Sequence, residues 1–482
     1  MLYRNILRVC AVSVLSLSML SAYGDKNKEG EAAGIWYRAG YEEYYLVSQN
    51  SAELYKATIN AESKAVEWCF SSESIPLAEF LAATTIRHDI SLEVDTGILR
   101  DRDDGPYTYK KVNTLPEACQ DGGQLVAGEE GFDGDIVRDF ELLWHSFNTF
   151  YPYFGLHDID WSQEYLNLRN SITESTRADE LVETVAEVLE VTEDTHLGIE
   201  LNEEVILFPN FRVRGFVEEL YKSFESQEEF EDFFDFVFNQ LNAELPQAML
   251  NTYLNLVGEF NGLADGEVDV KYLWGDLNKV GYNSIGYLSV SSFAESEVTL
   301  LQEKKALEDA FSILTNSDAL IIDVRNNTGG SYNLALFLAG FLVDEPTHMF
   351  NKQAFTSGNT QPSQSVNVKP SMKTGYSKPV YILQNGLSAS AAETFALAAK
   401  ALPHVTIIGE SSQGATASTI TRSLPFSGII LHIPSDIHSD LGGKNYEGIG
   451  LTPAVQVPDS RLEGVDSILL KALELAAEKL CT

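Results

Sequence analysis

From Tyr282 onward, short apolar segments alternate with helical ones, and this alternation constrains the fold more than any other feature of the sequence. The expected strands are Ile285–Val290, Ala319–Val324, Val380–Leu383, Val405–Gly409 and Ile429–Ile433. The expected helices are Thr299–Leu314, Asn333–Leu342, Ser390–Ala401 and Ser467–Lys479. Strands that alternate with helices indicate an α/β domain, in which helices cover a sheet. We place this domain at residues 281–482.

Two further regions precede this domain, because a chain of 482 residues exceeds what one hydrophobic core supports. Residues 25–125 contain short runs of Tyr, Val and Ile separated by turn residues, which is typical of a small β-rich domain. Residues 131–280 repeat apolar side chains at helical spacing and predict a helical subdomain. Its stretch Val217–Leu241 is rich in Phe, and such a stripe indicates core packing rather than a cofactor site.

The first 24 residues have the pattern of a signal peptide. Arg4 and Arg8 precede an apolar run, Val9–Leu20, and Ala22-Tyr23-Gly24 supplies a small-x-small cleavage site. The run is too short to span a bilayer, and no later segment reaches that length. The sequence therefore predicts export, to the periplasm or the exterior, without a membrane span.

The formal net charge of −38 argues against nucleic acid as a partner, because a phosphate backbone is bound by clustered Lys and Arg. The acidic residues are spread along the chain, and we interpret them as a solvated surface. Cys69 and Cys119 can form a disulfide in an oxidising compartment, or remain buried and unpaired. Cys481 has no obvious partner.

One local segment predicts a nucleophile: residues 385–393, NGLSASAAE, follow a buried strand and open an Ala-rich helix. Ser390 would stand at the helix N-terminus, where the helix dipole stabilises an alkoxide or oxyanion. The small neighbours admit a substrate carbonyl, and the free N–H of Ala391 can donate to its oxygen. Taken alone, Ser390 also fits an ordinary N-cap serine.

Two other segments supply parts of the same chemistry. Residues 321–330, IIDVRNNTGG, end a strand in paired glycines, and such a loop either presents N–H groups to an anion or forms a plain turn. Residues 192–198, TEDTHLG, carry His196, whose ordinary pKa suits a general base near neutral pH. A single His is also common as a surface or capping residue.

Together these segments resemble the C-terminal-processing (tail-specific) serine peptidases. Residues 321–330 are similar to the oxyanion-loop motif, 388–393 to the nucleophile motif, 405–414 to the strand and loop that follow, and 285–293 to the opening strand. The likeness covers most of residues 133–457. It implies a ClpP/crotonase-like sheet covered by helices, with Ser390 as the nucleophile.

Within that family, the sequence takes the tricorn-like side. One branch uses a Ser-Lys dyad, but the loop 409–416 reads GESSQGAT and places Ala415 at the lysine position. The tricorn-like branch uses a His from the helical region and a late Glu. Residues 189–197, which end in His196, and residues 446–453, YEGIGLTP, which contain Glu447, resemble those two motifs.

The resemblance implies an exported serine-type endopeptidase that needs no metal or cofactor. His196 would take the proton of Ser390, and Glu447, with Thr195 as an auxiliary, would orient the imidazole. The N–H groups of Gly329 or Gly330 and of Ala391 would bind the oxyanion. The expected substrates are peptides or unfolded proteins; the pattern indicates no particular oligomeric state.

Two features depart from the family layout. No PDZ-like segment is evident between His196 and Tyr282, where acidic Phe-rich helices are expected, and the β-rich domain at 25–125 lies outside the usual arrangement. A non-catalytic ligand- or partner-binding protein on the same fold is therefore the alternative. A metal hydrolase is disfavoured, because His432 and His438 imply no third ligand.

Overall fold

The computed structural model describes residues 33–480 except 61–62, 64, 72–73, 77–89, 94–97, 102–107, 123–125, 203, 208–214, 216–217, 219–253, 265–266, 278–281, 295–299 and 358–360. The expected signal peptide and nearly all of the Phe-rich stretch 217–241 lie outside the described residues. Within the described part of the chain, no helix is long and apolar enough to cross a membrane.

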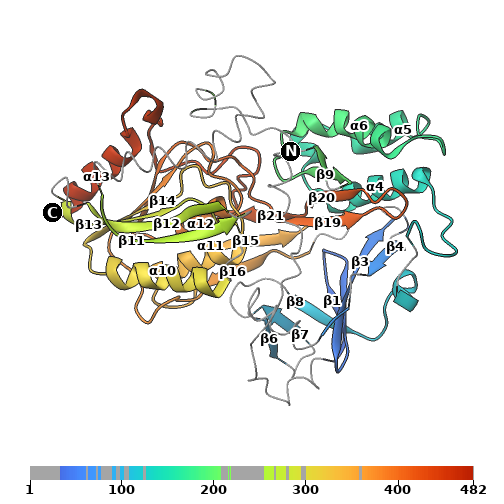
Figure 1. Cartoon of the computed structure of the whole chain (residues 1–482), viewed down its shortest axis with the longest axis horizontal. Coiled ribbons are helices and arrows are strands. Elements are labelled where there is room, and N and C mark those ends of the chain that lie inside the picture. The colour runs from blue at the N-terminus through green and yellow to red at the C-terminus, as the bar shows by residue number, and fades with distance from the viewer. Residues whose placement is uncertain are drawn as a thin grey trace.

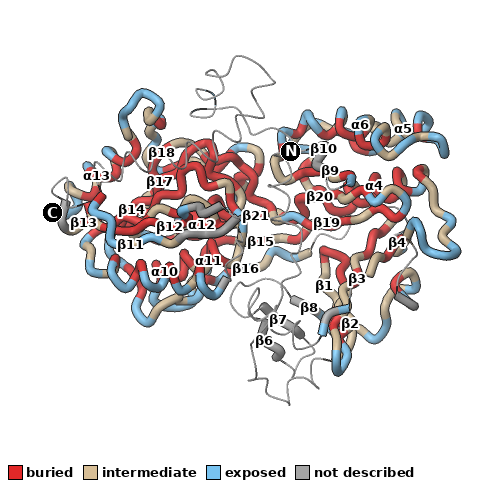
Figure 2. The backbone as a smooth tube through the Cα atoms, viewed as in Figure 1, coloured by how far each residue is buried: buried red, intermediate tan, exposed pale blue. Residues whose placement is uncertain are grey.

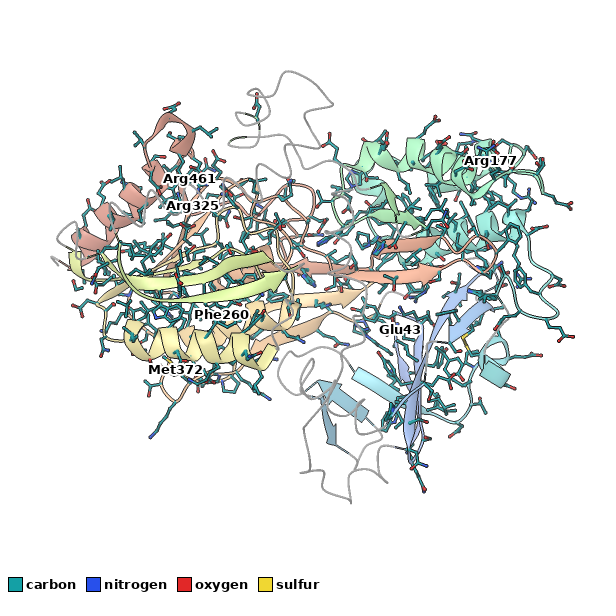
Figure 3. The ribbon with its side chains drawn as sticks, in the orientation of Figure 1. Glu43, Arg177, Phe260, Arg325, Met372 and Arg461 are labelled. Atoms are coloured by element: carbon teal, nitrogen blue, oxygen red, sulfur yellow. A yellow bond between two sulfur atoms is a disulfide. The ribbon has the colours of Figure 1, made fainter. Side chains whose placement is uncertain are left out.

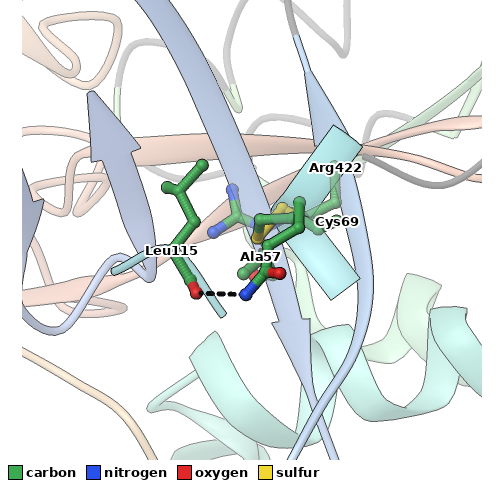
Figure 4. Close-up of a disulfide and its surroundings, with 6 residues drawn as sticks. Ala57, Cys69, Leu115 and Arg422 are labelled. Carbon is green, nitrogen blue, oxygen red and sulfur yellow. Dashed lines mark hydrogen bonds between the residues drawn. A yellow bond between two sulfur atoms is a disulfide. The ribbon is translucent and has the colours of Figure 1, made fainter. Parts of the chain in front are cut away.

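The N-terminal region forms an antiparallel sheet in the order β4-β3-β2-β1-β8-β7-β6, with β5 beside β3 (Figure 1). Its strands are β1 (Gly34–Arg38), β2 (Glu43–Val47), β3 (Ser51–Ile59), β4 (Val66–Ser71), β5 (Ile75–Pro76), β6 (Ile90–Glu93), β7 (Ile98–Asp101) and β8 (Thr108–Val112). A disulfide joins Cys69 on β4 to Cys119 on the 3-10 helix η2 (Glu117–Gly122), and both sulfur-bearing residues are fully buried (Figure 4). Of the two sequence alternatives for these cysteines, the structure has the bonded one.

The disulfide closes a loop of 50 residues, and its removal should destabilise the N-terminal sheet. Restricting the unfolded chain by a loop of that length is worth about 4 kcal/mol in the chain-entropy account. We expect the Cys69→Ala/Cys119→Ala double variant to lower the denaturant midpoint of this sheet, measured by hydrogen exchange of its amides. Cys481→Ala is the matched control and should leave that midpoint unchanged; equal midpoints for all three chains would contradict the prediction.

The second region contains α4 (Ile136–Phe150), η3 (Phe154–His157), α5 (Trp161–Leu168), α6 (Ala178–Leu189) and η4 (Glu190–Thr192). Asp135 begins α4, because its side chain accepts the N–H of Arg138. The buried faces of α4 and α6 pack on a sheet of order β10-β9-β20-β19. These strands are β9 (Gly198–Leu201), β10 (Glu204–Leu207), β19 (Thr419–Ser423) and β20 (Ile430–Pro434).

The central sheet has the order β11-β12-β13-β14-β17-β18-β22. Pairing is antiparallel from β11 to β13 and parallel from β13 to β22. Its strands are β11 (Asn255–Ala264), β12 (Glu267–Leu277), β13 (Tyr282–Val290), β14 (Ala319–Asp323), β17 (Val380–Gln384), β18 (Val405–Gly409) and β22 (Val455–Gln456). This is a mixed α/β fold with a mostly parallel central sheet.

Helices cover both faces of this sheet, as Figures 1 and 2 show. Side chains of β13 alternate: Leu288 and Val290 join the core with α10 (Leu300–Leu314), α11 (Tyr332–Ala339) and α12 (Ala391–Ala399), whereas Tyr287 joins the core with α13 (Ser467–Leu480). A short 3-10 helix, η7 (Gly340–Leu342), continues α11. A three-stranded sheet, β16-β15-β21, extends toward the second region. Its strands are β15 (Thr347–Ala354), β16 (Gln364–Val368) and β21 (Asp436–Ser439).

The five expected strands and four expected helices of the α/β region are confirmed, with three corrections. The strand expected at 429–433 is β20, and it pairs with β9 and β19 rather than joining the central sheet. Helix α12 begins at Ala391, so Ser390 precedes it. Two strands that lie before residue 281, β11 and β12, belong to the central sheet, so the interval between His196 and Tyr282 is not wholly helical.

Candidate active site

Ser390 stands at the turn between β17 and α12, in a backbone conformation that non-glycine residues rarely adopt. Its φ is 54° and its ψ is −117°. Holding a serine there costs free energy, and a rigid surrounding must maintain it. Neighbouring groups pack tightly: a Cβ atom added to Gly329 would lie 2.5 Å from Ser390 Cβ. The turn thus places Ser390 beyond the end of β17 and in tight contact with the loop that contains Gly329.

Glu393 fixes this turn from inside the protein. Its Oε2 accepts the N–H of Ser390 at 3.1 Å and that of Ala415 at 2.8 Å. Its Oε1 accepts the hydroxyl of Ser412 at 2.5 Å and the N–H of Gly414 at 2.7 Å. Burial raises the pKa of Glu393, and the four donors act against that rise. Glu393 therefore ties the nucleophile turn to the loop that follows β18.

The glycine loop after β14 is held by asparagines. Asn327 Oδ1 accepts the N–H of Gly329 at 2.9 Å, and the Asn327 carbonyl accepts the N–H of Ala389 at 3.0 Å. Gly329 and Gly330 have φ values of 108° and 129°, which favour glycine at both positions. In the part of the chain that the structure describes, no acceptor is recorded for the N–H groups of Gly330 and Ala391. Among those residues, the N–H of Ala391, which directly follows Ser390, and that of Gly330 can therefore receive an oxyanion.

A buried ionic network supports the base of this loop. Arg325 lies between Asp323 and Asp466, with contacts of 2.6 Å to each. Arg461 contacts Asp459 at 2.6 Å and Asn326 Oδ1 at 3.0 Å. Figure 3 shows Arg325 and Arg461 close together on the side of the sheet that α13 covers. The network joins the C-terminal segment to the loop and so fixes where the glycines stand.

His196 lies in the turn between η4 and β9, two residues before the strand begins. Asp194 Oδ1 accepts the N–H of His196 at 3.0 Å, and Asp194 Oδ2 accepts the Tyr151 hydroxyl at 2.9 Å. The ring meets the backbone of Ala417, and its Nδ1 is buried with no recorded partner among the described residues. Burial lowers the pKa of His196, and the nearby carboxylates act in the opposite direction. The imidazole is therefore neutral at pH 7, as a general base must be.

Glu447 is buried and accepts hydrogen bonds from the backbone at Thr416 and Ala417, the segment that also meets His196. Its Oε2 accepts the N–H and the hydroxyl of Thr416, both at 2.7 Å, and the N–H of Ala417 at 3.0 Å. Its Oε1 is buried and has no recorded partner among the described residues. Burial, and then the charge of Asp194, raise the pKa of Glu447 well above its usual value. The buried hydroxyl of Thr195 is likewise without a recorded partner in that part of the chain.

One backbone segment, residues 412–418, connects these groups. Its first half binds Glu393, and through Glu393 it reaches Ser390. Its second half binds Glu447 and meets His196. No direct hydrogen bond between Ser390 and His196, or between His196 and Glu447, is recorded for the described residues. Catalytic hydrogen bonds are often long or poorly aligned in sites without substrate, and they tighten when substrate binds.

Sequence reasoning missed several residues of this arrangement. Glu393 was within the nucleophile motif, yet three of its four hydrogen bonds come from a loop about twenty residues away in the chain. Asp194 lay two residues before His196, a spacing that can predict an Asx-type contact. Asp436, the first residue of β21, carried no sequence signal, because its partners Tyr41 and Lys352 lie far from it in the chain. Groups of three or more potential metal ligands are absent from the described residues.

Comparison with known proteins identifies the α/β region. Residues 284–457 match the family described as peptidase family S41. The chain contains a peptidase family S41 domain. The matched range includes Ser390, Glu393 and Glu447, whereas His196 lies before it. The resemblance to C-terminal-processing peptidases is thereby confirmed.

Two relatives extend this finding, each with a limit. The chain is 28% identical over 134 residues to the carboxy-terminal processing protease CtpA of Bacillus subtilis (strain 168), a match that covers 27% of this chain and 26% of the relative. It therefore spans about a quarter of the relative's length. The crystal structure of a putative peptidase from Parabacteroides merdae ATCC 43184 is 20% identical, covers 71% of this chain and 97% of that one, and has a TM-score of 0.54. That likeness shows a shared fold.

The tricorn protease is similar over 91% of this chain and 46% of its own, at 14% identity and a TM-score of 0.40. A likeness with that TM-score does not assign the chain to the tricorn-like branch, and the assignment stays a prediction.

Proposed function

We propose that the chain is an exported serine endopeptidase in which Ser390 attacks a peptide carbonyl. The observation that carries this proposal is the strained turn of Ser390, pressed against Gly329 within an S41 domain. A serine hydroxyl at a helix N-terminus, next to the Ala391 N–H and pressed against the glycine loop, is the arrangement that acyl transfer needs. The disulfide between Cys69 and Cys119 supports export, because such bonds persist in oxidising compartments.

The residues have distinct roles in this mechanism. His196, neutral because burial lowers its pKa, accepts the Ser390 proton as the Oγ–C bond forms. The N–H groups of Ala391 and Gly330 bind the resulting oxyanion; Gly329 N–H can do so only by sharing its bond to Asn327. His196 then protonates the leaving amine, and water releases the acyl group from Ser390. Glu447 and Thr195 would orient the imidazole through the polar atoms they hold without partners.

The absence of the Ser-Lys dyad supports a histidine mechanism. Ala415 occupies the lysine position, is buried, and donates its N–H to Glu393. A lysine there would place an ammonium group in this packed interior and disturb the Glu393 contacts. The branch assignment therefore agrees with the way the loop is packed.

Casein hydrolysis by the full mature chain tests this function, beside Ser390→Ala and Ala415→Lys. Cleavage by the parent chain, absent in Ser390→Ala and not increased in Ala415→Lys, is the expected result. Equal behaviour of the parent chain and Ser390→Ala would reject Ser390 as the nucleophile and favour a binding protein. Increased cleavage by Ala415→Lys would instead favour a lysine-dependent site.

The pH dependence of kcat/KM should reflect the lowered pKa of His196. The ordinary value for a histidine is 6.5, and the base must be neutral to accept a proton. Because the pKa of His196 lies below that value, we expect more than half of the maximal kcat/KM to remain at pH 6.5. A pH series with a neutral peptide substrate measures the acidic limb. A limb with its midpoint above pH 6.5 would contradict this reading of the site.

A further inference from the structure

The imidazolium that forms on His196 needs a nearby negative charge, and Glu447 is poorly suited to supply it. Burial, and then the charge of Asp194, raise the pKa of Glu447 well above its usual value, which disfavours its charged form. A neutral carboxyl group can orient a ring by hydrogen bonding but cannot offset its charge. Two further carboxylates act on His196, those of Asp194 and Asp436.

Asp436, the first residue of β21, is a fully buried carboxylate with donors on both oxygens. Oδ1 accepts the N–H of Ser418 at 2.7 Å and lies 3.2 Å from His438 Nε2. Oδ2 accepts the Tyr41 hydroxyl at 3.0 Å and lies 2.9 Å from Lys352 Nζ. A set of donors this complete favours the charged form. The pKa of Asp436 is accordingly held far below its ordinary range, with burial opposed by Lys352 and His438.

The backbone places Asp436 beside His196. Ser418, which donates to Asp436, directly follows Ala417, whose backbone meets the His196 ring. The charge of Asp194, and then that of Asp436, raise the pKa of His196 against the effect of burial. Thus the two carboxylates of this cluster are bound by consecutive peptide groups: Glu447 by residues 416 and 417, and Asp436 by residue 418.

Residues from three regions of the chain surround Asp436. Tyr41 belongs to the turn between β1 and β2 of the N-terminal sheet, and Lys352 lies on β15 of the S41 domain. Tyr153, just before η3, donates its hydroxyl to the Asp436 carbonyl at 2.8 Å. The Tyr41 turn is itself anchored, because Arg422 on β19 donates to the Tyr41 carbonyl and to that of Ala57. The N-terminal sheet thereby reaches the catalytic cluster.

We propose that Asp436 is a positioning residue for His196, held as an anion by Lys352 and by Tyr41 of the N-terminal sheet. The proposal rests on the proposed function, in which His196 is the general base. It gives the N-terminal sheet a role in the site, since Tyr41 completes the hydrogen bonds of the carboxylate. The titratable groups that face the pair are Lys352, His438, Tyr41, Tyr153 and Asp194, with Glu447 across the same backbone segment.

The test measures the pKa of His196 by NMR titration of its ring in the Ser390→Ala background. Asp436→Asn removes the negative charge and should lower that pKa by about one unit, whereas Lys352→Met removes the opposing charge and should raise it. Asp309→Asn, on the exposed face of α10, is the charge control and should have no effect. If Asp436 had only a structural role, the two substitutions would shift the pKa of His196 in the same direction or not at all. Either result would overturn the proposal.

Tyr41→Phe provides a variant that keeps the Asp436–Lys352 pair and is expected to fold. With Ser390 restored, it should lower kcat about tenfold, with KM unchanged, because the donated hydrogen bond acts on the base rather than on substrate binding. An unchanged kcat in Tyr41→Phe would contradict the role proposed for the N-terminal sheet in the site. Because the NMR measurement needs no activity, a chain that fails to cleave casein but shows the opposite shifts would reject the proposed function and retain the link between Asp436 and His196.

Discussion

Replacement of Ser390 by alanine should reduce kcat for peptide hydrolysis by about a million-fold, to the background of the assay. The loss is this large because the Oγ–C bond and the acyl-enzyme depend on this one oxygen, and every other group of the site acts on it. Turnover of a casein-derived fluorogenic peptide by the full mature chain measures the effect. The fold should be retained, since no hydrogen bond from the Ser390 hydroxyl is recorded among the described residues.

The matched control is Ser312→Ala on α10, whose hydroxyl donates to the nearby carbonyl of Asp309. It should cleave at the parental rate. If Ser390→Ala kept more than about one percent of the parental kcat, another nucleophile would be in operation, since a single essential oxygen leaves far less.

Replacement of Glu393 by alanine should have the second largest effect, on activity and stability together. Four donors would lose their acceptor in a buried site, and each unsatisfied group costs about 1–3 kcal/mol. The Ser390 turn, already strained, would relax away from Gly329. We expect kcat to fall at least about a hundred-fold and the free energy of unfolding to fall by roughly 3 kcal/mol or more. Steady-state kinetics and denaturant unfolding measure the two effects.

Glu393→Gln separates the charge of this residue from its shape. Glutamine has nearly the same size, yet its NH₂ group would face donors on one side of the cluster. It should therefore lose most of the activity that Glu393→Ala loses. Parental activity in Glu393→Gln would show that packing alone holds the turn, and would contradict the role we give to the four hydrogen bonds.

The sequence predicted the parts of the site that lie in short continuous motifs. Ser390, the glycine loop and Glu447 each lie within a few residues of chain whose spacing reflects local geometry. The positive φ of Ser390 was not predicted; it arises because a tight turn between a buried strand and a helix leaves few backbone conformations. The strands of the S41 domain were predictable because their apolar runs are nearly continuous, as buried parallel strands require.

The sequence could not predict what tertiary contacts decide. The role proposed for Asp436 depends on its contacts with Tyr41, Lys352 and Ser418, which lie up to 395 residues from it in the chain. The pairing of β20 with β9 likewise depends on two segments that approach in space, so its apolar pattern alone suggested the wrong sheet. Strands β11 and β12 were missed because their many polar residues conceal the alternation expected of a covered sheet.

The most direct test of the central claim is covalent labelling with a fluorophosphonate, followed by mass spectrometry of the digested full-length chain. The account predicts one adduct per chain, on the peptide that contains Ser390, and strongly slowed labelling in His196→Gln because the base that activates the hydroxyl is removed. An adduct on another residue, or labelling of Ser390 at the same rate in His196→Gln, would contradict the assignment of Ser390 as a nucleophile activated by His196.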